Sequence, residues 1–378
     1  MGIMAAPVGT ALAMGALGVL GYTYFGYPLA VAALAKLSPM ATRRDPTWEP
    51  KVSVLLPVMN AEAHVAQKLD SLFAQGWPTE KLEIVVYSDG STDRTDDIVR
   101  GYEGRGVRLI RGDVRRGKPS ALNAMRAVAT GEVFVLIDVR QMLAPGAIRA
   151  LVSALADPDV GTVSGNLVLE GSHGAGVYWK YEKAIRQAES RYRGMLGATG
   201  ALYAMRAADF PDSIPEDVLL DDVWIPFTAR LKGKKLLFEE DAVAYESAFE
   251  DDREFGRKVR TLAGNWQLFA KMPDLLNPSK NPSFFELVSH KGLRLVGPFA
   301  MGALAAGTIA ALARGEGGRS GKALLGALAA GQLGFAALAG LGDRAGALGR
   351  VARTFVVMNQ AAAVGLSRHL AGGQRITW

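Results

Sequence analysis

The feature that most constrains this 378-residue chain is the absence of any charged side chain between Met1 and Ala35. Residues 8–35 within this stretch are almost wholly Ala, Gly, Leu, Val and aromatic. The run exceeds the roughly 20 residues that a helix needs to cross a bilayer core. A cleaved signal peptide is the competing interpretation, but no Lys or Arg precedes the run and it is too long for a signal-peptide core. We therefore expect a retained transmembrane helix.

Basic residues follow this run directly, at Lys36, Arg43 and Arg44. Cytoplasmic flanks of membrane helices are rich in Lys and Arg, so we expect the next domain to lie in the cytosol, at the cytoplasmic membrane. The chain has no cysteine, which excludes disulfides, thiolate metal sites and cysteine nucleophiles. Its net charge of +6 suits an anionic membrane or a phosphorylated substrate as well as nucleic acid.

The C-terminal part of the chain is again apolar and rich in small residues. Residues 295–313 and 323–341 are of bilayer length, whereas a third stretch, 355–371, is interrupted by two basic side chains. Residues 279–294 mix aromatic, aliphatic and basic side chains and predict an interfacial amphipathic helix. We expect two to three C-terminal transmembrane helices. Buried helices of a soluble bundle are the alternative.

The middle of the chain has a different pattern, with short β-branched runs that alternate with amphipathic stretches. Residues 52–57, 82–87 and 133–137 are nearly continuously apolar, which is typical of buried parallel strands. Residues 63–75 and 92–101 are amphipathic and predict helices. Strands that alternate with helices indicate an α/β sheet covered on both faces.

An open α/β sheet binds its ligands at the carboxyl ends of its strands. Asn60 and Glu62 follow the first predicted strand, and Asp89 follows the second. A carboxylate at the position of Asp89 could accept the imide N–H of a pyrimidine. The alternatives are a helix cap at Asn60 and an Asx-turn at Asp89.

Two charged residues lie near the third predicted strand. Lys118 stands in a loop broken by Gly and Pro, where its ammonium could reach a phosphate. Asp138 ends the apolar strand, and a divalent cation that bridges a diphosphate would compensate its charge. The alternatives are a solvated basic loop for Lys118 and an ion pair with Arg140 for Asp138.

Acidic and basic clusters follow farther along the chain. Asp221 and Asp222 open a predicted helix, where they could be ordinary partners of the helix dipole. Adjacent carboxylates also raise each other's pKa, which can produce a general base. The cations Arg257, Lys258 and Arg260 could stabilise a departing diphosphate, or could form a solvated helix face.

In this order, the motifs resemble those of membrane-integrated family 2 glycosyltransferases of the GT-A fold, which build bacterial polysaccharides and glycolipids. They are Pro-x-x-Asn-x-Glu, Ser-Asp-Gly-Ser-Thr-Asp, Gly-Lys-x-x-Ala-Leu-Asn, a strand-end Asp, Gly-Ala-Thr-Gly-Ala and Asp-Asp. The resemblance implies an N-terminal transmembrane region (1–45), a Rossmann-like GT-A domain (46–278), an interfacial helix (279–294) and C-terminal transmembrane helices (295–378).

The resemblance also implies the chemistry. The expected reaction is inverting hexosyl transfer from a UDP-sugar, with Asp222 as the base that deprotonates the acceptor hydroxyl. Asp138 matches the first Asp of the metal-binding Asp-x-Asp motif, which implies Mg²⁺ or Mn²⁺. The residues expected to bind the donor or the acceptor are Pro57, Asn60, Glu62, Asp89, Lys118, Arg140, Asp221, Arg257, Lys258, Arg260 and Trp266.

Two departures from the family pattern qualify this expectation. Arg140 replaces the second Asp of Asp-x-Asp, so metal dependence is less certain and Arg140 could neutralise phosphate itself. In the Gln-x-x-Arg-Trp motif of processive synthases, Arg257 replaces Gln and Thr261 replaces Trp. Because an aromatic ring stacked on the acceptor sugar helps to hold a growing chain, we expect single addition, unless Trp266 substitutes.

The expected partners are the UDP-sugar, a lipid-linked or saccharide acceptor, membrane lipid and proteins of polysaccharide assembly, with no nucleic acid. Two other functions stay open. A non-catalytic, membrane-anchored nucleotide-binding member of the family would bind UDP without turnover. A nucleotidyltransferase on a similar fold would release pyrophosphate.

Overall fold

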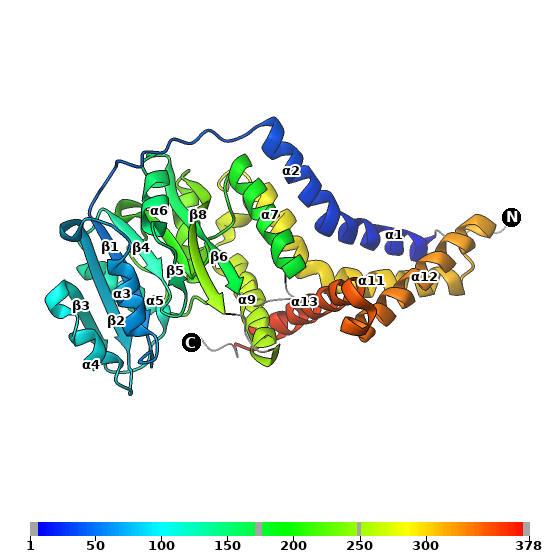
Figure 1. The fold of residues 1–378 in the computed structure, drawn as a ribbon. Coiled ribbons are helices and arrows are strands. Elements are labelled where there is room, and N and C mark those ends of the chain that lie inside the picture. Colours follow the sequence, from blue (N-terminus) through cyan, green and yellow to red (C-terminus); the bar gives the residue numbers. More distant parts are fainter. Residues whose placement is uncertain (1–6, 171–175, 248–250, 373–378) are drawn as a thin grey trace.

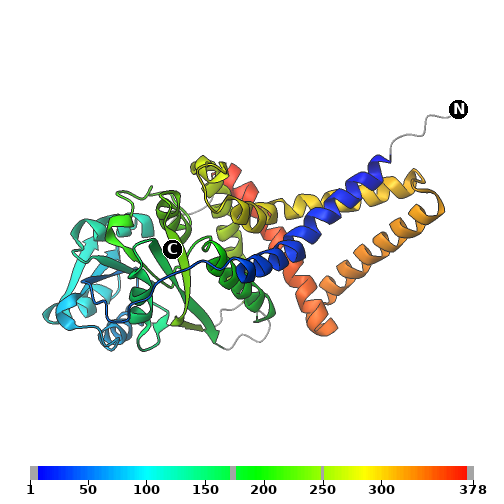
Figure 2. The ribbon, with the colours of Figure 1, turned by 90° about the horizontal axis from the view of Figure 1, so that it is seen from above.

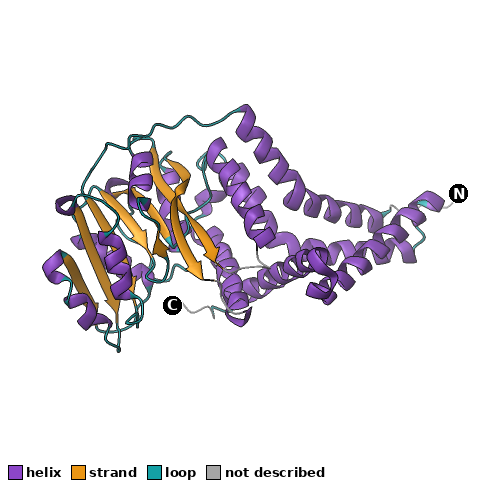
Figure 3. Ribbon diagram, in the orientation of Figure 1, coloured by secondary structure: helices purple, strands orange, loops and turns teal. Residues whose placement is uncertain are grey.

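The computed structural model describes residues 7–170, 176–247 and 251–372. An α/β domain lies at one end of the molecule and a long helical arm extends from it (Figure 1). Strands occur in the α/β domain, and the described part of the arm is helical (Figure 3). The ends of the predicted terminal regions, 1–6 and 373–378, lie outside the described residues.

The α/β domain is built on one eight-stranded sheet with the order β3-β2-β1-β4-β7-β6-β8-β5. The strands β3, β2, β1 and β4 are parallel, whereas β7 runs antiparallel to both β4 and β6. The strands are β1 (Val52–Val58), β2 (Leu82–Asp89), β3 (Val107–Gly112), β4 (Val133–Ile137), β5 (Met142–Leu143), β6 (Val160–Glu170), β7 (Leu202–Arg206) and β8 (Lys235–Ser247). The three predicted strands are confirmed as parallel neighbours.

Pro57 lies inside β1 and is paired in register with Tyr87 of β2, so it does not end the strand. The pairing of β1 with β4 stops at Leu55, whereas its pairing with β2 continues to Val58. Proline cannot donate a hydrogen bond to a sheet. It is tolerated here because this end of β1 has a strand partner on one side only.

Helices cover both faces of the sheet, as the alternating pattern predicts. They are α3 (Val65–Phe73), α4 (Thr95–Arg100), α5 (Lys118–Val128), α6 (Ala147–Leu155), α7 (Gly176–Tyr192) and α8 (Asp221–Leu231). Helix α9 (Asp251–Lys271) packs instead against the last helix of the arm, α13 (Gly346–Leu370). Alternate side chains of a strand point to opposite faces. Val54 and Leu56 therefore pack with Leu69 of α3 and Leu151 of α6, whereas Leu55 packs on the other face with α5 and α8.

The arm contains three stretches that are long and apolar enough to cross a membrane: Val8–Leu37, Phe284–Ala313 and Gly318–Leu370. The elements are α1 (Val8–Gly21), the π-turn η1 (Tyr22–Gly26), α2 (Tyr27–Leu37), α10 (Phe284–Leu287), the π-turn η6 (Val288–Gly292), α11 (Leu293–Ala313), α12 (Gly318–Leu341), η7 (Gly342–Ala345) and α13 (Gly346–Leu370). The segment expected to be a separate interfacial helix continues through η6 into α11.

The first and last parts of the chain pack together along the arm. Helices α1 and α11 run side by side, and α12 and α13 meet at η7 (Figure 2). A Cβ at Gly9 would lie 2.5 Å from the backbone nitrogen of Ala311, and one at Gly307 would lie 2.7 Å from that of Ala13. Small residues at these crossings therefore let the two backbones approach closely.

Helix α7 joins the α/β domain to the arm through buried polar contacts. The Tyr27 hydroxyl donates a hydrogen bond to Glu189 at 2.6 Å, and His290 Nδ1 lies 2.6 Å from the same carboxylate. Arg294 forms a salt bridge of 2.5 Å with Glu182. The residues come from α2, η6 and α11 on the arm side, so α7 fixes where the apolar helices of the arm begin relative to the sheet.

Candidate active site

Asp89, the last residue of β2, holds the loop that leads to Lys118. Its two carboxylate oxygens accept hydrogen bonds from the backbone N–H groups of Arg116 and Gly117, both at 2.8 Å. Asp89 is fully buried, and Gly90 after it has a positive φ of 67° that suits a tight turn. The structure thus gives Asp89 a positioning contact, and its predicted role toward a pyrimidine stays a prediction.

Lys118, the first residue of α5, lies among carboxylates from two other elements. Its Nζ atom is 2.8 Å from Asp138 Oδ1 and 3.3 Å from Asp221 Oδ2. Asp138 directly follows β4, and Asp221 begins α8. The carboxyl edge of the sheet therefore brings together three of the predicted residues, with two carboxylates around one buried ammonium.

Asp222 completes this cluster. Its Oδ2 atom accepts a hydrogen bond from the Gly200 backbone N–H at 3.1 Å, and its backbone oxygen accepts one from Ala198. A Cβ at Gly200 would lie 3.4 Å from Asp222 Oδ2, 3.6 Å from Asp138 Oδ2 and 3.6 Å from Lys118 Nζ. The absence of a side chain at Gly200 leaves space between these three polar groups, where a reacting substrate could be accommodated.

The charges in the cluster adjust each other's proton affinity. Burial and the neighbouring Asp221 carboxylate raise the pKa of Asp222 to about 6. Burial alone would lower the pKa of Lys118, but Asp138 and Asp221 outweigh it and hold the pKa above its ordinary value. Lys118 therefore stays a cation, while Asp222 titrates near neutrality, as suits a general base.

Asn60 and Glu62 hold the turn after β2. Asn60 Oδ1 accepts the backbone N–H of Thr92 at 2.8 Å, and Glu62 Oε2 accepts that of Arg94 at 3.1 Å. Asn60 is the one described non-glycine residue with a positive φ, 46°, a conformation that Asn tolerates better than most residues. Both side chains therefore order the turn after β2. Asn60 is not the cap of the helix that follows it, because α3 begins at Val65 after His64. Direct ligand contact stays a prediction.

Two of the predicted basic residues, Arg140 and Arg257, lie close to one carboxylate. Arg140 and Arg257 each approach Glu246 Oε1 at 3.9 Å, and Gln141 donates to the same oxygen at 2.7 Å. Lys258 and Arg260 lie one and three residues beyond Arg257 on α9. The Asp138 alternative of an ion pair with Arg140 is not what the structure shows, because Asp138 pairs with Lys118.

Trp266 lies in a different environment. Its ring packs in a cluster with Val259, Leu262 and Leu295 and with residues of α13. The structure therefore uses this ring where α9 meets the arm, and none of its described contacts includes Lys118 or Asp222. The predicted role of Trp266 toward the acceptor stays a prediction.

Three further residues lie at or beside the site, although the sequence assigned none of them a role in binding or catalysis. Glu246 lies close to Arg140 and Arg257. Lys68 on α3 is buried and donates to the Gln141 backbone oxygen, and burial lowers its pKa to about 8. Lys291 of η6 lies close enough to Asp222 for its charge to lower the pKa of that carboxyl. Glu246 and Lys291 could not be found from spacing because they enter from β8 and from the arm.

One carboxylate of the cluster, Asp138, could contribute a ligand to a divalent metal. Among the described residues, no three His, Asp or Glu side chains are arranged to hold a metal ion. Arg140 stands where a second carboxylate would be expected, and Asp138 Oδ1 is taken by Lys118. Mg²⁺, however, is often bound by one or two carboxylates together with substrate phosphates. Asp138 is the residue of this chain that would supply such a ligand.

Comparison with known proteins agrees with this geometry. Residues 53–209, which contain β1 to β7 and the Lys118, Asp138 and Gly200 positions, match the family described as Glycosyl transferase family 2. This chain carries a family 2 glycosyltransferase domain. A mannosyltransferase from Pyrobaculum calidifontis, solved in complex with GDP-Man and Mn²⁺, has a similar structure with a TM-score of 0.75 and 28% identity. The similarity covers 96% of this chain and 100% of that chain, so the GT-A fold is confirmed.

Curated relatives match over a shorter stretch of the glycosyltransferase domain. A probable glycosyltransferase of Bacillus subtilis, YdaM, is 33% identical over 135 residues, or 32% of each chain. Validoxylamine A glucosyltransferase of Streptomyces hygroscopicus subsp. limoneus is 32% identical over 127 residues, which are 33% of this chain and 27% of the relative. The matched stretch thus spans about a third or less of these relatives' own lengths.

Proposed function

We propose that the protein is an inverting glycosyltransferase that moves a sugar from a nucleoside diphosphate sugar to a lipid-linked or saccharide acceptor at the cytosolic membrane face. The observation that carries the proposal is the cluster of Lys118, Asp138 and Asp222 around Gly200, at the carboxyl edge of the sheet. This edge is where α/β folds bind nucleotides. The solved mannosyltransferase with similar structure binds GDP-Man and Mn²⁺.

The roles of the residues follow from their charges and positions. Asp222, with a pKa of about 6, accepts the proton of the acceptor hydroxyl. The acceptor oxygen then forms a bond to the anomeric carbon as the bond from that carbon to the diphosphate oxygen breaks. The nucleoside diphosphate leaves with the electron pair, and attack from the opposite face inverts the anomeric configuration.

The cations stabilise the charge that develops on the leaving group. Lys118 is permanently charged and stands within the cluster, and Arg140 and Arg257 lie together beside Glu246. Fixed positive charges in a site of low dielectric stabilise a developing anion strongly. A bound Mg²⁺ or Mn²⁺ on Asp138 would add to this neutralisation of the diphosphate.

We retain the UDP-sugar as the predicted donor and compare it with GDP-sugars, which carry guanine in place of uracil. Purified full-length protein in detergent is incubated with a panel of UDP- and GDP-sugars, with Mg²⁺, Mn²⁺ or a chelator, and nucleoside diphosphate release is measured. Turnover of at least one donor that is lost in Asp222→Asn supports the proposal. Nucleotide binding without turnover would instead support the non-catalytic alternative, and pyrophosphate release would support a nucleotidyltransferase.

A further inference from the structure

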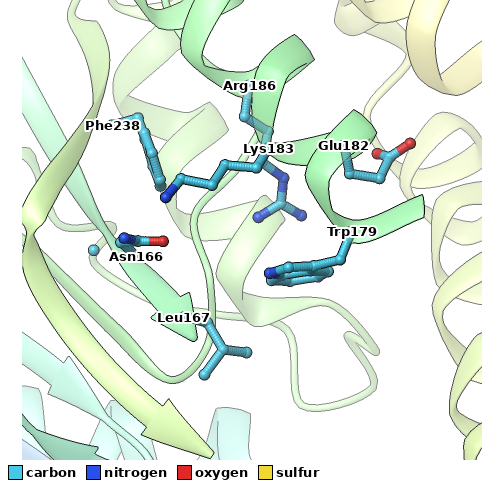
Figure 4. A pocket seen from close by; sticks show the side chains of 8 residues that line it. Asn166, Leu167, Trp179, Glu182, Lys183, Arg186 and Phe238 are labelled. Atoms are coloured by element: carbon cyan, nitrogen blue, oxygen red, sulfur yellow. The ribbon is translucent and has the colours of Figure 1, made fainter. Parts of the chain in front are cut away.

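A pocket lined by both charged and apolar side chains lies near the candidate active site, on the side of the domain that faces the arm. It is a narrow cleft between β6, β8 and α7 (Figure 4). Trp179, Lys183 and Arg186 line it from α7, and Leu167 and Phe238 line it from the two strands. Helix α7 packs against α2, so the pocket lies next to the start of the membrane helices.

Two cations of α7, Lys183 and Arg186, line the pocket, and Arg186 interacts electrostatically with the Glu182 carboxylate. Lys183 extends across it toward Phe238, and the Arg186 guanidinium lies between Lys183 and Trp179 (Figure 4). Arg186 is 5.8 Å from the Trp179 ring centroid, and no described residue forms a hydrogen bond or a salt bridge with either cation. Glu182, the carboxylate of the pocket wall, points away and is occupied by its salt bridge with Arg294 at 2.5 Å.

Hydrogen bonds link one wall of the pocket to the catalytic cluster. Gly165 of the pocket follows Ser164, whose hydroxyl accepts the backbone N–H of Thr199 at 3.0 Å. The next residue, Gly200, donates to Asp222. Lys291 interacts electrostatically with both Arg186 and Asp222, so a third cation is near both the pocket and the proposed base.

We propose that this pocket binds the phosphate group of the acceptor, and that the acceptor is a saccharide linked to a lipid through a phosphate or diphosphate. The inference rests on the proposed function, because it specifies which acceptor reaches Asp222. Lys183 and Arg186 bind the anionic group, and Trp179 offers an aromatic face to an adjoining sugar. The lipid chain lies along the arm, and a hydroxyl of the bound saccharide extends past Lys291 toward Asp222.

Binding of a short lipid phosphate tests this inference. Full-length protein in detergent is titrated with farnesyl phosphate, with farnesol as the probe that lacks the anion and with glucose 1-phosphate as the probe that lacks the lipid. We expect farnesyl phosphate to bind at least tenfold more tightly than either control. Removal of each cation, in Lys183→Gln and Arg186→Gln, is expected to weaken its binding by about tenfold, the loss of one charge-assisted hydrogen bond.

Two control variants distinguish the loss of a pocket charge from a general disturbance of the helix. Lys180→Gln removes an exposed lysine of the same helix outside the pocket and is expected to bind farnesyl phosphate like the wild type. The exchange Lys183→Arg with Arg186→Lys keeps both charges and is expected to retain most of the binding. Unchanged binding in Lys183→Gln with Arg186→Gln, or equal binding of farnesol, would overturn the proposal.

The remaining outcomes are also decisive. If glucose 1-phosphate binds as tightly as farnesyl phosphate, the anion comes from a soluble molecule and the lipid-linked acceptor is wrong. Donor turnover by the wild-type protein, measured separately, decides the proposed function. Donor turnover without cation-dependent binding of farnesyl phosphate would contradict the proposed acceptor site and would leave the proposed glycosyltransferase activity intact.

Discussion

Lys118 Nζ lies 2.8 Å from Asp138 Oδ1, although Lys118 begins α5 and Asp138 directly follows β4. The same ammonium is 3.3 Å from Asp221. This arrangement makes the lysine the charge that balances the acidic residues at the carboxyl edge of the sheet. It also means that the proton affinity of the proposed base, Asp222, depends on a residue more than a hundred positions earlier in the chain.

The pH dependence of turnover should report the titration of Asp222. Only the deprotonated carboxylate can accept a proton, and burial and Asp221 raise its pKa to about 6. We therefore expect kcat/KM for glycosyl transfer to rise with pH through about 6 and to level off above it. A profile measured from pH 4.5 to 8 checks this. A flat profile over that range would contradict the role of Asp222.

Loss of the Lys118 charge should lower the activity and shift the acidic limb of the pH profile. The charge of Lys118 lowers the pKa of Asp222, so Lys118→Gln is expected to move the acidic limb upward in pH. Removal of one partner from a buried ion pair costs about 3 kcal/mol, and we expect a lower unfolding temperature. We expect kcat/KM to fall by about 10²-fold, in line with the loss of one stabilising group in a transition state.

A surface lysine provides the comparison for this variant. Lys81→Gln removes a partly exposed charge that pairs with Glu49 at 3.6 Å, far from the cluster in the fold. It should leave the pH profile unchanged. If Lys118→Gln lowers the unfolding temperature but leaves the acidic limb in place, Lys118 has a structural role only.

Asp89→Asn should disturb the site through the loop rather than through direct contact with the reacting atoms. The carboxylate accepts two backbone N–H groups, and an amide keeps one good acceptor only. We expect donor affinity to fall by about tenfold, because Lys118 is less well placed. Nucleotide binding by calorimetry checks this, with the exposed Asp212→Asn as the control. Wild-type affinity in Asp89→Asn would show that the loop needs no such support.

Arg140→Asp should restore a second carboxylate two residues after Asp138. Because Mn²⁺ prefers oxygen ligands, we expect its affinity in the presence of nucleotide to rise by about tenfold. Electron paramagnetic resonance of Mn²⁺ measures this without relying on activity. Arg140→Gln removes the cation without adding a ligand and should show a smaller gain. Equal Mn²⁺ binding in both variants would mean that position 140 does not face the metal.

The sequence indicated the strands β1, β2 and β4 correctly because a fully buried parallel strand must be almost continuously apolar. It also indicated that polar residues after these strands would meet, since the carboxyl ends of parallel strands share one edge. The position of Asp138 follows from that rule, whereas Lys118 begins α5 and Asp222 lies in the first turn of α8. Family motifs then supplied the roles that spacing alone left open.

Other features depend on contacts between segments that are distant in sequence. Pro57 is accommodated in β1 because β4 stops pairing before it, and Asn60 and Glu62 are engaged by the turn after β2. Neither partner is adjacent in the chain, so no local pattern reveals which alternative holds. Helix 284–292 likewise continues into α11, where an amphipathic composition alone suggested a separate segment.

By itself, the sequence determined the order of apolar and α/β regions, the parallel strands and the residues at their ends, because these depend on local periodicity. Only the tertiary structure decided which charges compensate one another. Asp138 pairs with Lys118 and not with Arg140, Glu182 is taken by Arg294, and Lys183 and Arg186 are left facing a pocket. Electrostatic pairing depends on distance in space, and distance in space is set by packing between elements.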